Sequence, residues 1–86
     1  MASYWERFMD LSEAEQEEVN FENMVHTFGQ ELRRIRGGER ATIVIPQSNT
    51  RTGLRAKGIL IQVFSGGGKE IVISEKTRRL LQRSEP

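Results

Sequence analysis

Residues 59–73 read ILIQVFSGGGKEIVI, and this stretch decides the fold class. Its two ends are rich in β-branched residues, and Gly66-Gly67-Gly68-Lys69 separates them, a pattern that predicts a β-hairpin. We expect one strand within Leu54–Ser65 and the next over Glu70–Ser74.

A third run of the same kind precedes this hairpin. Ala41–Ile45 reads ATIVI and is stopped by Pro46, which has no N–H to donate to a sheet. This run predicts an earlier strand, followed by a polar loop over residues 47–53. Residues 40–74 are therefore expected to form a three-stranded antiparallel meander.

The chain before the strands has the pattern of a long amphipathic helix over residues 12–36. Ser12 and Glu15 form a capping box at its start, and Gly37-Gly38 is typical of a helix end. Gly29 weakens the helix by about 1 kcal/mol relative to alanine. An apolar stripe at helical spacing runs along one face. Its residues are Phe21, Val25, Phe28, Leu32 and Ile35.

Two shorter helical segments flank this core. Ser3 and Glu6 fit a second capping box, so residues 1–11 are expected to form a short turn rich in aromatic residues. Ser74 is expected to cap a basic helix over residues 75–83. The fold class is therefore α+β, with a long N-terminal helix packed on a three-stranded antiparallel meander and a short basic C-terminal helix.

Length and composition bound the possible classes of protein. The 86 residues are expected to form a single small domain. The absence of cysteine excludes disulfides, a thiolate nucleophile and cysteine-based metal sites. The longest apolar runs are too short to span a membrane, and the chain start lacks the pattern of a secretory signal. We expect a cytoplasmic protein with no membrane partner.

The chain carries few groups suited to catalysis. His26 is the only histidine, and no nucleophile or set of metal ligands lies near it in sequence. The carboxylates from Glu13 to Glu18 begin a helix, where they stabilise the helix dipole. The glycines of Gly66–Lys69 lie between strands, whereas a phosphate-binding loop needs a helix after it. The sequence predicts no enzyme activity, no cofactor and no metal site.

The net charge of +1 hides an uneven distribution. Residues 1–31 carry eight acidic residues and one basic residue, a net charge of −7. Residues 32–86 carry twelve basic and four acidic residues, a net charge of +8. Part of this asymmetry suits the dipole of the long helix. Residues 37–86 nevertheless keep nine basic and four acidic residues, a net charge of +5, which indicates a negatively charged partner.

The positive charge gathers in the polar segment 46–58 and in the C-terminal helix. In the first, cations are interleaved with hydroxyls, amides and glycines, which are groups that bind phosphate oxygens. A solvated loop and a basic chain end are the ordinary alternatives. Phe64 is the only aromatic residue beyond residue 28, so phosphate contacts fit better than recognition of single-stranded bases. The predicted nucleic-acid-binding residues are Arg51, Arg55, Lys57, Lys76, Arg78, Arg79 and Arg83.

Two features suggest protein partners. Trp5 and Phe8 in the aromatic turn could anchor a partner protein or pack on their own sheet. In the central strand, Ile59, Ile61 and Val63 alternate with Leu60 and Phe64, so both faces are largely apolar. Either the terminal helices cover the second face or a second copy of the chain does.

The sequence thus predicts a non-enzymatic small binding protein that contacts nucleic-acid phosphates through the basic loop and C-terminal helix, as a homo-oligomer. The alternative is an assembly component, or a regulator of nucleic-acid machinery, that binds a partner protein through its acidic N-terminal helix and aromatic turn. Retention on nucleic acid separates the two hypotheses, because only the first requires it.

Overall fold

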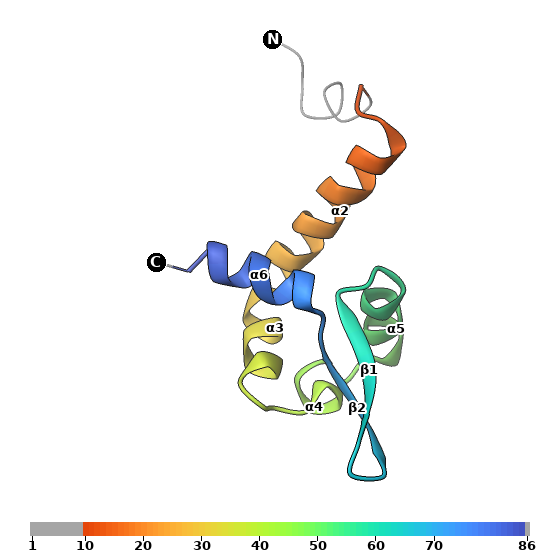
Figure 1. Cartoon of the computed structure of the whole chain (residues 1–86), viewed down its shortest axis with the longest axis vertical. Helices are drawn as coiled ribbons and strands as arrows, with labels where there is room; N and C mark the ends of the chain where they lie inside the picture. Colours follow the sequence, from red (N-terminus) through yellow and green to blue (C-terminus); the bar gives the residue numbers. More distant parts are fainter. Residues whose placement is uncertain (1–9, 86) are drawn as a thin grey trace.

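The computed structural model describes residues 10–85. Its elements are helices α2 (Glu13–Thr27), α3 (Gly29–Arg36), α4 (Ala41–Val44) and α5 (Ser48–Ala56), strands β1 (Leu60–Ser65) and β2 (Gly68–Ile73), and helix α6 (Glu75–Arg83). In Figure 1, α2 extends away from a group formed by the hairpin and the other helices. The α+β class is confirmed. No helix within the described range is long and apolar enough to cross a membrane.

The expected three-stranded meander is wrong, because Ala41–Ile45 does not form a strand. Residues 41–44 form helix α4, and the described sheet holds only β1 and β2. Ala41, Val44 and Ile45 are buried at three- and four-residue spacing, which is the spacing of one helix face. Burial on the core side of a helix therefore outweighs the β-branched propensity of this run.

The polar loop expected after Ala41–Ile45 is also wrong, because residues 48–56 form helix α5. Only Leu54 is buried on this helix, so the sequence lacks the apolar stripe by which helices are recognised. The guanidinium of Arg51 donates to the carbonyl of Ile45 (2.7 Å) and joins the helix to the turn before it. Gly58, with φ of +77°, adopts the left-handed conformation that follows the helix end.

The predicted long helix divides at Phe28 into α2 and α3. Phe28 has φ of −99° and ψ of 19°, and α3 starts at Gly29, the glycine that weakens the helical pattern. The predicted apolar stripe is confirmed, since Phe21, Val25, Leu32 and Ile35 are buried and Phe28 packs against them. The capping box of Ser12 and Glu15 is also present.

The β-hairpin is confirmed. Its antiparallel register pairs Leu60 with Ile73 at one end and Ser65 with Gly68 at the other. Gly66 and Gly67 have φ of +57° and +80°, so the connection needs residues that tolerate the left-handed region.

The core gathers residues from every described helix and from both strands. The buried apolar residues are Phe21, Val25, Leu32, Ile35, Ala41, Val44, Ile45, Leu54, Ile59, Leu60, Ile73 and Leu81. Helix α6 has the predicted bounds, and the Ser74 hydroxyl caps it by accepting from the Thr77 N–H. The Thr77 hydroxyl is itself fully buried and donates to the carbonyl of Ile59 (3.0 Å).

We expect Leu54→Ala to lower the free energy of unfolding by about 2–5 kcal/mol, because it leaves a cavity at a fully buried position. Urea denaturation measures the change. Ile43→Ala is the matched control, since Ile43 is 67% exposed on α4, and its effect is expected to stay below about 0.5 kcal/mol. Equal losses in the two variants would contradict the position of Leu54 in the core.

Candidate nucleic-acid interface

Helix α5 and the hairpin meet at a polar contact. The guanidinium of Arg55 donates to the side-chain oxygen of Gln62 on β1 (2.9 Å), and both side chains lie at the surface. Helix α5 lies at one edge of the molecule beside β1 (Figure 1). Because the contact uses a neutral acceptor, Arg55 keeps its positive charge free for an anion.

A cleft continues this surface between the start of α4 and the hairpin. It has a volume of about 550 Å³, and Gln62 lines it, so it adjoins the Arg55 contact. Arg40 comes from the start of α4 and Lys69 from β2, and neither forms an ion pair within residues 10–85. The cleft also holds the hydroxyls of Thr42 and Ser65 and one carboxylate, Glu70. It therefore combines two cations, which form no ion pair in the described range, with hydroxyl and amide groups and one carboxylate.

The other two cations of the predicted basic segment are placed differently. Arg51 is half-buried and turned inward to the carbonyl of Ile45, so it supports the α4–α5 turn. Lys57 is exposed just after α5 and lines a small pocket that α2 also borders. The structure therefore separates the segment into one supporting cation, Arg51, and two surface cations, Arg55 and Lys57.

Two of the predicted cations of α6 form ion pairs within the chain. Lys76 pairs with Glu18 of α2 at 2.5 Å and lies 4.3 Å from the centre of the Phe21 ring. Arg79 pairs with Glu75 at 3.4 Å within the same helix. These carboxylates reduce the attraction that either cation exerts on an external anion.

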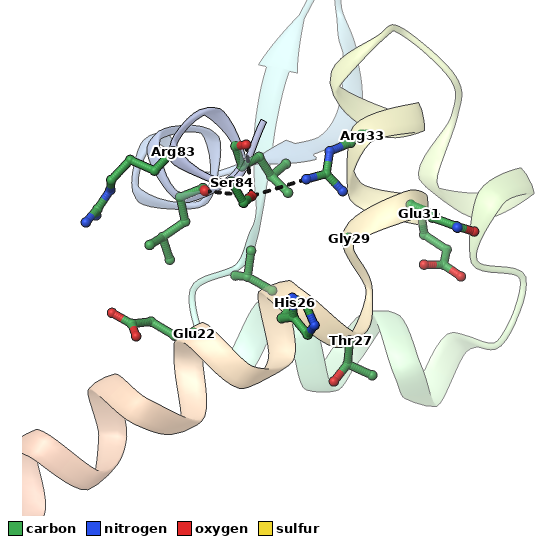
Figure 2. Close-up of a pocket in the computed structure, with 12 residues that line it drawn as sticks. Glu22, His26, Thr27, Gly29, Glu31, Arg33, Arg83 and Ser84 are labelled. Atoms are coloured by element: carbon green, nitrogen blue, oxygen red, sulfur yellow. Dashed lines mark hydrogen bonds between the residues drawn. The ribbon is translucent and has the colours of Figure 1, made fainter. Parts of the chain in front are cut away.

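Arg78 and Arg83 are exposed and form no ion pair in the described part of the chain. Arg83 borders a groove of about 590 Å³ between α6 and the bend of α2 and α3. Figure 2 shows this groove, with Arg33 donating to the Ser84 hydroxyl (3.2 Å) and Glu22 and His26 on α2. The mixed charges of its lining make it less suited to phosphate than the α5 surface. No cluster of three metal-ligating side chains forms within residues 10–85.

The residues expected at a protein interface differ in burial where the structure describes them. Ile59 is fully buried in the core of this chain. Ile61 is 41% exposed on β1, and Val63 is half-buried on the same face. Trp5 and Phe8 lie outside the described residues.

Three members of the candidate surface were not predicted from the sequence, namely Arg40, Gln62 and Lys69. Arg40 and Lys69 are isolated cations in sequence, and only the packing of α4 beside the hairpin brings them to one cleft. The glycine run before Lys69 was the one available signal, since it predicts that this residue lies near an exposed hairpin end.

Ion pairs made by arginines at the end of α3 perturb two carboxyl groups. Hydrogen bonds from Arg34 at 2.8 Å hold the pKa of Glu39 below its usual value. A hydrogen bond from Arg36, followed by Arg33, lowers the pKa of Glu85 in the same way. Arg34 is thus paired with Glu39, while Arg33 and Arg36 share Glu85, and these pairs reduce the attraction of the end of α3 for an external anion.

No protein family, curated protein or solved structure matches this chain.

The pair of Glu85 with Arg36 and Arg33 is expected to make stability depend on acid. Because folding lowers the pKa of Glu85, its contribution is present above the unfolded value near 4.5 and is lost as the pH falls through the folded value. Urea midpoints measured from about pH 6 to about pH 3 are expected to fall less for Glu85→Gln than for the unsubstituted protein. Parallel pH profiles for the two proteins would contradict this linkage.

Proposed function

We propose that this protein is a non-enzymatic nucleic-acid-binding protein whose α5–hairpin surface contacts phosphates. The observation that carries the proposal is the continuity of Arg55, Gln62 and the cleft that contains Arg40 and Lys69. Guanidinium and ammonium groups beside hydroxyl and amide groups are the usual donors to phosphate oxygens.

The distribution of negative charge supports this surface over the rest of the molecule. Helix α5 contains no acidic residue, and Lys57 follows directly after it. Glu18 of α2 pairs with Lys76, and Glu17 and Glu18 line a pocket with Ala56 and Lys57, so carboxylates border the end of α5. The start of α5 and the cleft are the part of this surface with the fewest carboxylates, and nucleic acid meets the least repulsion there.

The C-terminal helix has a smaller part in this proposal than the sequence indicated. Lys76 and Arg79 are compensated by Glu18 and Glu75. Arg78 and Arg83 are exposed, form no ion pair in the described range and remain candidates for contacts with flanking phosphates. The alternative of a partner protein bound through the acidic N-terminal helix and the aromatic turn stays a prediction, and Trp5 and Phe8 of that turn lie outside the described residues.

We expect retention on duplex nucleic acid that weakens steeply with salt. Contacts from Arg40, Arg55, Lys57 and Lys69 would give a log–log slope of about −4 on B-DNA. Fluorescence anisotropy over a salt series measures the slope, and Arg55→Gln is expected to reduce its magnitude by about 1.

Arg79→Gln is the matched control for this experiment, because it removes the same charge from α6, where Glu75 already compensates it. Its effect on the slope is expected to be smaller than that of Arg55→Gln. Absence of any binding at about 50 mM salt would rule out the proposed function.

The proposal includes a homodimer formed through the outer face of the hairpin. Ile61 pairs with Val72 across the strands, and Val63 lies on the same face, so three apolar side chains are partly exposed together. A two-fold axis would place this patch against its own copy.

Light scattering at micromolar concentration is expected to give the mass of a dimer, and Ile61→Lys is expected to give the mass of a monomer. A charge at the centre of the patch would lose its hydration on association. Ile43→Lys places the same charge on exposed α4 and is expected to leave the dimer intact. A monomeric mass for the unsubstituted protein would contradict the dimer.

A further inference from the structure

The outward face of α5 carries polar side chains that the fold does not use. Ser48, Asn49 and Thr52 are exposed, and their side chains form no hydrogen bond with another residue in the range 10–85. Arg55 follows Thr52 by three residues and also points away from the core. Spacings of three and four residues place all four on one face of the helix, opposite buried Leu54.

Contacts on the core side of α5 fix the position of this helix. Helix α4 and α5 are joined by only three residues, and Ile45 in this turn is buried. Leu54 anchors α5 in the core, and Arg51 ties it to the carbonyl of Ile45. Helix α4 is a single turn of four residues, so α5 is the element of this pair that is long enough to present side chains to a DNA groove, as recognition helices do.

The dimensions of α5 select one class of nucleic acid. An α-helix with its side chains is about 10–12 Å in diameter, and the B-DNA major groove is about 12 Å wide and admits it, with α5 offering nine residues along the groove. The major groove of A-form RNA is too narrow and deep for a helix. Single-stranded bases need aromatic platforms, and α5 has no aromatic residue.

The chemistry of the outward face matches base edges as well as phosphates. An asparagine side chain can pair with adenine through two hydrogen bonds, and an arginine with guanine in the same way. A threonine offers a hydroxyl to base edges and a methyl group to thymine. The same segment, taken as a loop, indicated phosphate contacts alone; as a helix, it presents Asn49 and Thr52 at positions that enter a groove first.

From these observations we infer that the protein reads duplex DNA sequence, with α5 in the major groove and Asn49 and Thr52 at base edges. This inference rests on the proposed function, because Arg40 and Lys69 supply the flanking phosphate contacts. Arg55 contributes at the far end of the same face, where Gln62 orients its guanidinium.

Selection from a pool of random DNA duplexes tests the inference. The full chain is expected to enrich a short motif, and single base-pair changes in that motif are expected to weaken binding by about 5- to 150-fold. Asn49→Ala is expected to abolish the preference at one position of the motif while binding to unselected duplex stays within about 2-fold. Thr52→Ala is expected to weaken the base preference at a neighbouring position of the motif.

Thr50→Ala is the matched control, because Thr50 is half-buried on the same helix and does not share the outward face. It is expected to keep the full motif, and circular dichroism checks that each variant is folded. Salt-sensitive binding without any enriched motif would overturn the inference and leave the proposed function intact. Stronger binding to duplex or single-stranded RNA would overturn it in the same way, and absence of all binding would overturn both.

Discussion

The structure depends on the backbone of Ile59, whose side chain is fully buried. Its N–H donates to the carbonyl of Leu54 at the end of α5 (2.9 Å), and its carbonyl accepts from Ser74 (2.9 Å) and Thr77 (3.0 Å). One residue thus joins α5, the hairpin and α6. Since buried backbone groups must be satisfied, these three elements cannot separate without leaving several polar groups unpaired in the core. The orientation of α5 relative to the hairpin, on which the candidate surface relies, follows from this junction.

Some charged residues form ion pairs within the molecule, whereas others form none in the described range. Carboxylates compensate the arginines at the end of α3 and the lysine at the start of α6. The cations around α5 and the hairpin form no ion pair in the described chain, so their field extends into solvent. A small net charge is therefore compatible with a local excess of positive charge, because acidic and basic residues neutralise each other elsewhere.

Local signals in the sequence predicted the helix caps, the hairpin and the final helix. The Ser12 and Ser74 caps and the glycine turn depend on residues that are close in sequence, so they can be predicted without knowledge of the tertiary structure. Ala41–Ile45 and α5 were not predictable in this way, because their helical state comes from burial of Val44, Ile45 and Leu54 against distant residues. The candidate surface was found in part. Arg55 and Lys57 stand in a visibly basic segment, whereas Arg40 and Lys69 become neighbours of it only in three dimensions.

The separation of the two faces of α5 has an evolutionary consequence. Leu54 and Arg51 hold the helix in place, while the side chains of Ser48, Asn49 and Thr52 are exposed and form no described hydrogen bond. Substitutions at these three exposed positions carry little thermodynamic penalty, since changes on the surface away from such contacts are usually small. Descendants of this chain can therefore diverge in what α5 recognises while they inherit the same scaffold.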